Sequence, residues 1–321
     1  MGIVAVALLL AAARISASDD VARAAEYDEI TQRYVDGAVA ARRAMAARVG
    51  VAPSPARPFV FLHQRKTGGT TFRGQLRRLA REQALGSWLA CYDGVDCRTY
   101  EPPRGGLGNA SVVGGHLYWP RVAAALPGGF DCLTIFREPV SRVASCWNFR
   151  FVQQRGGVAK SPYAPFHAYN ASALRSALPG ARSRQREGCN NEPFRVLGDF
   201  GRRDEDAVSF LTARAGGGDG APKALDAALA HMQRCVVGVL ERCNDTAEAL
   251  SYFQPWLRGL RHGCEKGRGR VQIGSTPRGT LDDAQRAEVA RQNALELRLY
   301  RAAGAMLDAQ LLVARSQRRD A

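Results

Sequence analysis

The sequence predicts an α/β fold in which a central, mainly parallel sheet lies between helices. Short apolar runs rich in β-branched and aromatic residues recur along the chain, at 59–62, 112–113, 130–136 and 235–240. Runs of this length and composition are typical of buried strands. Helical patterns follow them, for example through Phe72, Leu76 and Leu79. Because strands that alternate with helices form parallel sheets, we expect a ligand to bind beyond the carboxyl ends of these strands.

The segment PFVFLHQRKTGGTTFRGQL, from Pro58 to Leu76, combines a strand, a tight loop and the start of a helix. The loop places backbone amides, hydroxyls and one ammonium at the positive end of that helix, in Lys66, Thr67, Gly68, Gly69, Thr70 and Thr71. Groups of this kind hold a phosphate. A Walker A loop is excluded, since its lysine follows the glycines. The simpler alternative is a glycine-containing turn with a solvated lysine.

A histidine follows the second predicted strand. His116 is the first side chain after Val112, Val113 and two glycines, so it is expected at the ligand-binding edge of the sheet. A neutral imidazole there could accept a proton from a hydroxyl near neutral pH. His63 is nearest in sequence to the phosphate loop and is the reserve candidate. The alternative is a histidine that is only hydrogen-bonded at the sheet edge.

The third predicted strand, FDCLTIF, runs directly into the segment REPVSRVAS. Pro139 suits a first helical turn, and the apolar residues after it have helical spacing. Arg137 is therefore expected to leave the strand end toward the ligand, with Ser145 further along the helix. The alternative is that Arg137 only pairs with Glu138 at the helix start.

These two motifs, in this order, resemble those of sulfotransferases that use 3′-phosphoadenosine 5′-phosphosulfate (PAPS). The pattern is closest to the heparan sulfate 6-O- and 2-O-sulfotransferases and covers about residues 58–310. K-T-G-G-T-T resembles the family's 5′-phosphosulfate loop, and R-[DE]-P-x-x-R-x-x-S its 3′-phosphate motif. The resemblance implies a three-layer fold of the P-loop type. It also implies that Lys66 and Thr67 to Thr71 bind the 5′ end of the cofactor, and that Arg137 and Ser145 bind its 3′-phosphate.

The resemblance further implies transfer of sulfonate from PAPS to a glycan hydroxyl, which leaves the nucleotide PAP. His116 takes the role of general base, and Lys66 stabilises the leaving oxygen. CNNEPFRVLGDF resembles the family's N-x-Q-x-R-x-L segment beside the acceptor, so Asn191 and Arg195 are expected to bind substrate. Pro193 stands in place of the glutamine, which leaves the acceptor open. No metal is expected, because the cysteines and histidines lack zinc-ligand spacing.

Two other function classes stay open. An atypical nucleotide-dependent kinase would use a similar loop and arginines, but the sequence lacks a recognisable magnesium-binding aspartate and a Walker-type lysine. A secreted, non-catalytic binder of anionic glycans would explain the arginines but not the paired phosphate motifs.

The net charge of +15 comes almost wholly from arginine, since lysine occurs only at Lys66, Lys160, Lys223 and Lys266. Arginine suits bidentate contact with sulfate, carboxylate or phosphate. The charge alone would also fit nucleic acid or a compositional bias toward arginine. With the resemblance, we expect an anionic glycan as the partner, and no nucleic acid.

The chain is expected to divide into residues 1–17 as a signal peptide or clipped membrane anchor, 18–57 as a stalk or linker, 58–313 as the sulfotransferase domain and 314–321 as a basic tail. The apolar run 2–13 is too short to span a bilayer. A proline cluster ends the stalk, and a long helical pattern from Leu281 to Val313 closes the domain.

Three glycosylation sequons, at Asn109, Asn170 and Asn244, accompany eight cysteines. With the leader, they favour the secretory pathway, and the resemblance places the protein in the Golgi lumen. In an oxidising compartment, Cys91 and Cys97 are close enough in sequence to form a local disulfide loop.

Overall fold

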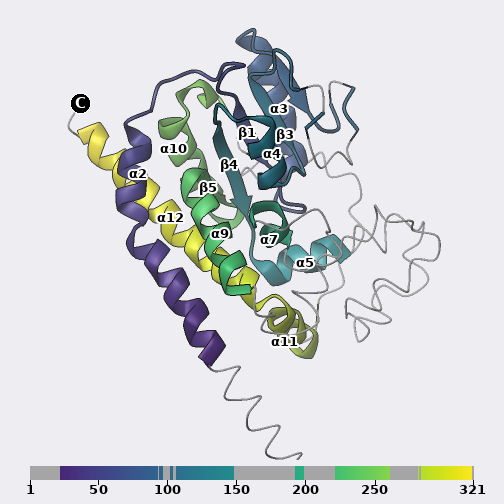
Figure 1. Ribbon diagram of the computed structural model, residues 1–321, viewed down its shortest axis with the longest axis vertical. Coiled ribbons are helices and arrows are strands. Elements are labelled where there is room, and N and C mark those ends of the chain that lie inside the picture. The colour runs from purple at the N-terminus through teal and green to yellow at the C-terminus, as the bar shows by residue number, and fades with distance from the viewer. Residues whose placement is uncertain are drawn as a thin grey trace, which may run out of the picture.

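The computed structural model describes residues 22–92, 94–96, 102–103, 106–147, 192–198, 221–260, 281 and 283–319. Five strands form one sheet in the order β2-β3-β1-β4-β5. They are β1 (Phe59–Leu62), β2 (Ser87–Leu89), β3 (Val112–Gly115), β4 (Asp131–Phe136) and β5 (Val236–Val239). Every pairing in this sheet is parallel. Helices flank the sheet in Figure 1, and the predicted α/β class is confirmed.

Alternation along the strands divides the core into two layers. Phe59 and Phe61 of β1 face a cluster that includes residues of α3 (Gly69–Glu82) and α10 (Cys243–Phe253). Val60 and Leu62 face the opposite cluster, which includes residues of α4 (Trp119–Ala125), α7 (Glu192–Leu197), α9 (Ala221–Arg234) and α12 (Ala294–Arg319). The arrangement is therefore three-layered, with β1 covered on both faces.

The long helix α12 also covers the edge of the sheet at β5. The buried amide of Gln310 pairs with one residue of that strand, because Val237 N donates to Gln310 Oε1 at 2.8 Å and Gln310 Nε2 donates to Val237 O at 2.8 Å. An exposed strand edge can pair with other chains. Here Gln310 satisfies the edge at Val237, and the hydroxyl of Thr246 on α10 does so at Val239.

The connections between strands define where a ligand would bind. After β1, the chain passes through α3 toward β2, at one edge of the sheet. After β4, it passes through α5 (Pro139–Trp147) toward β5, at the opposite edge. β1 and β4 are adjacent in the sheet. In α/β proteins, ligands bind at a switch of this kind, beyond the carboxyl ends of the two strands. The predicted phosphate loop and Arg137 both begin at those ends.

Two elements differ from the sequence-based expectation. β2 was not expected, since a strand of three residues with a partly exposed start carries little pattern. The helical pattern from Leu281 is two helices, α11 (Asp283–Gln292) and α12. They part at Asn293, a buried residue whose side-chain amide donates to Val289 O at 2.8 Å. The backbone N of Asn293 donates to the same oxygen at 3.0 Å, and sharing of an acceptor in this way often bends a helix.

The N-terminal segment packs against the domain instead of standing apart as a stalk. Residues 22–36 and α2 (Ala38–Ala46) are helical, and Tyr27, Ile30 and Ala38 belong to the same core cluster as the sheet. In Figure 1, α2 (purple) lies along α12 (yellow). The expected basic tail likewise continues α12, which ends at Arg319 with Ala314 fully buried. The expected leader, 1–17, lies outside the described residues.

Arg42 explains why α2 belongs to the domain. Its side chain is completely buried, and its guanidinium donates to the carbonyls of Met232, Gln233 and Cys235 at the end of α9. The last carbonyls of a helix have no partner within the helix, so a cation there satisfies them and favours the helix dipole. Burial lowers the pKa of Arg42 to about 9.

A disulfide joins Cys132, in β4, to Cys235, directly before β5. The two cysteines extend the register that pairs Leu133 with Val236, so they lie opposite each other on neighbouring strands. Cys91, Cys146 and Cys243 are also disulfide-bonded. Cys97, the expected partner of Cys91, lies outside the described residues. None of the helices in the described part of the chain is both long and apolar enough to cross a bilayer.

We predict that Arg42→Met lowers the free energy of unfolding by roughly 2–4 kcal/mol, because it leaves buried carbonyls without donors. Arg43→Met, at the exposed neighbouring position, serves as the control and should change stability by less than about 0.5 kcal/mol. Chemical denaturation measures both. Equal stability of the two variants would show that α2 adds nothing to the domain.

Candidate active site

The loop after β1 has a strained turn at its centre. Lys66 has a φ of 67° and Gly68 a φ of 83°, so the chain is left-handed on both sides of Thr67. Glycine adopts this conformation freely, but for lysine it costs about 1–2 kcal/mol. Gly68 is the N-cap of α3, and no side chain caps the helix among the described residues. The first amides of α3 are therefore donors for an anion.

Gly69, the first residue of α3, allows the helix to approach β1 closely. A Cβ atom at this position would lie 1.9 Å from ring atoms of His63. The imidazole of His63 therefore occupies the space that any larger residue would need. The second glycine of the loop is required by packing against His63, whereas the first is required by its backbone conformation.

Side chains from distant parts of the chain hold both ends of the strained turn. Arg65 N donates to Glu192 Oε1 at 2.9 Å, immediately before Lys66. Arg137 Nη1 donates to the carbonyl oxygen of Lys66 at 3.0 Å. The hydroxyl of the buried Thr67 donates to Gln64 O at 2.7 Å. Strained backbone persists where its surroundings determine it, and it is concentrated at functional sites.

The two candidate histidines are stacked on each other. Their ring centroids are 4.3 Å apart, with 26° between the ring planes. Pairing of β1 with β3 brings them together, since His63 N donates to Gly115 O. His116 Nδ1 lies 3.0 Å from the carbonyl oxygen of His63. A carbonyl only accepts, so Nδ1 carries the proton and a neutral His116 has its lone pair on Nε2.

Burial and positive charge keep both imidazoles neutral at neutral pH. The pKa of His116 is lowered to about 3, mainly by burial and in part by the charges of Arg65 and Arg73, whereas Glu192 acts in the opposite direction. For His63, burial is again the main cause of a pKa well below the usual value, followed by His116 and by nearby cations. His63 is 3% exposed and His116 more so. His116 is therefore the more accessible proton acceptor.

The second motif starts at the end of β4, next to the loop. Glu138 does not pair with Arg137 as the simpler alternative supposed. Its carboxylate accepts from Val140 N at 2.9 Å and Ser141 N at 2.7 Å, so it caps α5. Arg137 contacts the loop instead. Ser145 lies on α5 and is 7% exposed. Arg142, the second arginine of the motif, is completely buried in ion pairs.

Of the expected site residues, the loop, Arg137 and the histidines lie at the carboxyl ends of β1, β3 and β4. Arg195 falls within α7, and Asn191 lies outside the described residues.

Sequence reasoning missed Gln64, Arg73 and Glu192. Gln64 is buried and donates to Thr134 Oγ1 of β4 at 2.9 Å. Arg73 is 1% exposed and donates to Ala90 O at 2.8 Å. A polar residue in a helix pattern carries no signal of such burial.

No family model matches the chain, and no curated protein sequence matches it. Within the described residues, no group of three or more histidine, cysteine or acidic side chains could hold a metal ion.

The left-handed turn at Lys66 gives a prediction with an internal control. Lys66→Gly and Lys66→Ala both remove the ammonium, but only glycine relieves the backbone strain. We expect the glycine variant to be more stable by about 1 kcal/mol. At Arg78, an exposed position in the interior of α3, the order should reverse, since alanine favours a helix over glycine by about 1 kcal/mol. Denaturant titration of the four variants measures this. An alanine variant at Lys66 as stable as the glycine variant would contradict the strain.

Proposed function

We propose that the protein transfers sulfonate from PAPS to a hydroxyl of a glycan. The observation that carries this proposal is the hydrogen bond between Arg137 Nη1 and Lys66 O, at 3.0 Å. It joins the two segments whose sequences resemble the 5′-phosphosulfate loop and the 3′-phosphate motif of sulfotransferases. The segments follow adjacent strands at the switch point of the sheet, where ligands of α/β proteins bind.

The residues at this edge of the sheet suit an anionic nucleotide. The first amides of α3 and the hydroxyls of Thr70 and Thr71 would bind the 5′-phosphate of PAPS, and Lys66 its phosphosulfate. Arg137 and Ser145 would bind the 3′-phosphate. Charge-assisted hydrogen bonds of this kind are the strong ones. PAPS supplies an activated sulfonate, and the protein's part is to position the reactants and stabilise charge.

His116 would act as the general base. With Nδ1 engaged by His63 O, Nε2 takes the proton from the acceptor hydroxyl. The hydroxyl oxygen would form a new bond to sulfur, opposite the bridging oxygen. The bond between sulfur and the bridging oxygen would break. The electron pair stays on the bridging oxygen of PAP, where the ammonium of Lys66 balances the new charge. Bound phosphosulfate offsets the field of Arg65 and Arg73, which raises the proton affinity of His116.

The acceptor is proposed to be an anionic, heparan-sulfate-like glycan. The net charge of +15, supplied mainly by arginine, supports a polyanionic partner. The Cys132–Cys235 disulfide and the sequons support residence in the lumen of the secretory pathway, with the Golgi as the compartment that sulfation implies. A membrane anchor at the N-terminus is part of the same proposal.

The test measures the transfer of labelled sulfonate from PAPS to a panel of glycans, by the wild-type protein and by His116→Ala. Wild-type protein should label at least one glycan. His116→Ala should keep its affinity for PAP within a few-fold and lose about 10²- to 10⁴-fold in transfer rate, as expected of a lost general base. His63→Ala is the control for packing, because it removes the neighbouring buried ring.

Absence of transfer to every glycan, together with absence of PAP binding, would overturn the proposal. Full activity of His116→Ala combined with loss of activity in His63→Ala would assign the base to His63 and leave the reaction unchanged.

A further inference from the structure

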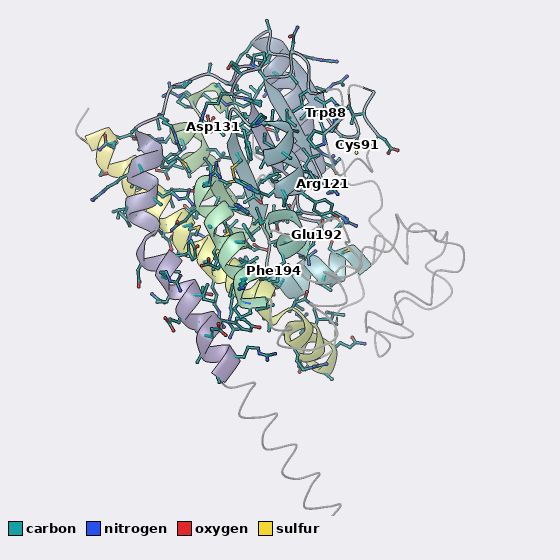
Figure 2. The ribbon with its side chains drawn as sticks, viewed as in Figure 1. Trp88, Cys91, Arg121, Asp131, Glu192 and Phe194 are labelled. Atoms are coloured by element: carbon teal, nitrogen blue, oxygen red, sulfur yellow. A yellow bond between two sulfur atoms is a disulfide. The ribbon has the colours of Figure 1, made fainter. Side chains whose placement is uncertain are left out.

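Glu192, the first residue of α7, bridges the loop after β1 and the rest of the molecule. Its Oε1 accepts from both Arg65 N, at 2.9 Å, and Arg65 Nε, at 3.0 Å. Its Oε2 lies 3.3 Å from Arg142 Nη1. The carboxylate is 2% exposed. Figure 2 labels Glu192 on α7, which is separated from the loop by more than a hundred residues of sequence.

The ion pairs continue from Glu192 into α5 and α12. Arg142, on α5, donates to both carboxylate oxygens of Glu296, on α12, and both side chains are almost completely buried. The alternating charges of Arg65, Glu192, Arg142 and Glu296 balance one another. Removal of one carboxylate from such a buried set leaves an excess of buried positive charge, which is costly. The four side chains therefore hold one arrangement of loop, α5, α7 and α12.

The point of attachment on the loop is specific. Glu192 binds the amide of Arg65, the residue before the left-handed Lys66, and Arg137 binds the carbonyl of Lys66 itself. The strained residue is thus held at both ends by side chains that come from other elements. Without Glu192, the Arg65–Lys66 segment loses the hydrogen bond at its N-terminal side and can relax to a less costly conformation.

We propose that Glu192 is a positioning residue that fixes the conformation of the Arg65–Lys66 segment and, through it, the nucleotide affinity of the loop. Its effect on the loop follows from the geometry alone, whereas its effect on PAP rests on the function proposed above. Glu192 acts through the hydrogen bonds that it accepts from Arg65 N and Nε.

Glu192→Ala and Glu296→Ala form a matched pair, because each removes one buried carboxylate from Arg142 but only the first contacts Arg65. Hydrogen exchange of the full-length protein, measured without ligand by mass spectrometry, reports on the peptide spanning residues 63–71. We expect exchange of its protected amides to accelerate about tenfold or more in Glu192→Ala relative to Glu296→Ala. Glu192→Gln, which keeps an acceptor for Arg65 N, should lie between wild type and Glu192→Ala.

PAP titration of the same proteins gives the second readout. Affinity should fall about tenfold or more in Glu192→Ala and remain within about threefold of wild type in Glu296→Ala, a ratio expected when one charged loop contact is lost. If Glu192→Ala does not fold, Glu192→Gln and Glu296→Gln carry the comparison, with the same order of effects.

The outcomes separate the two proposals. Equal exchange rates at residues 63–71 in Glu192→Ala and Glu296→Ala overturn the positioning role, whatever the affinity of these variants for PAP. Faster exchange in Glu192→Ala in a protein whose wild type does not bind PAP supports the positioning role and overturns the proposed function. Faster exchange with unchanged PAP affinity would show that Glu192 fixes only the conformation of the loop. It would overturn the proposed effect of Glu192 on nucleotide affinity.

Discussion

The burial of β1 between β3 and β4 is the constraint on which the rest of the structure depends. All its side chains are completely buried, and its parallel pairing on both sides aligns the carboxyl ends of three strands. Each of those ends delivers a polar segment to the same edge. β1 delivers the strained loop, β3 delivers His116, and β4 delivers Arg137. Burial of a four-residue apolar strand thus brings together polar residues from three parts of the chain.

Around this core, the protein buries several arginines, and each has different partners. Arg42 binds the final carbonyls of α9, Arg73 donates to the chain after β2, and Arg142 lies between two carboxylates. Burial of an unpaired charge is expensive, so each of these side chains has to keep its partners. The same rule explains why the N-terminal helices belong to the domain, since Arg42 keeps its partners only when α2 packs on α9.

The sequence predicted those parts of the fold that depend on local patterns. The limits of β1 were correct, because four apolar β-formers stand between a proline and a polar loop. The start of α5 was also correct, because Pro139 marks a first helical turn. β2 was missed because its pairing depends on β3 and not on its own residues. The Cys132–Cys235 disulfide could not be predicted, since a sequence separation of 103 gives no indication of neighbouring strands.

The same distinction applies to the site. The loop, Arg137 and His116 were predicted from motifs and strand ends, and the structure brings their segments to one edge. The stacking of His63 on His116 could not be predicted, because it depends on the register between β1 and β3. Glu192 was missed for a similar reason. It lies in a segment interpreted as an acceptor contact, and only the folded chain brings its carboxylate to Arg65.

The central claim is that the segments after β1 and β4 form one site for a nucleotide with a 3′-phosphate. The most direct measurement is calorimetric titration of the wild-type protein and Arg137→Ala with PAP and with adenosine 5′-phosphate, in the absence of magnesium. The account predicts that wild type binds PAP at least about tenfold more tightly than adenosine 5′-phosphate, which is the contribution of one charged hydrogen bond. It also predicts that Arg137→Ala loses most of this preference. Equal affinity of wild type for the two nucleotides, or binding only with magnesium, would contradict it.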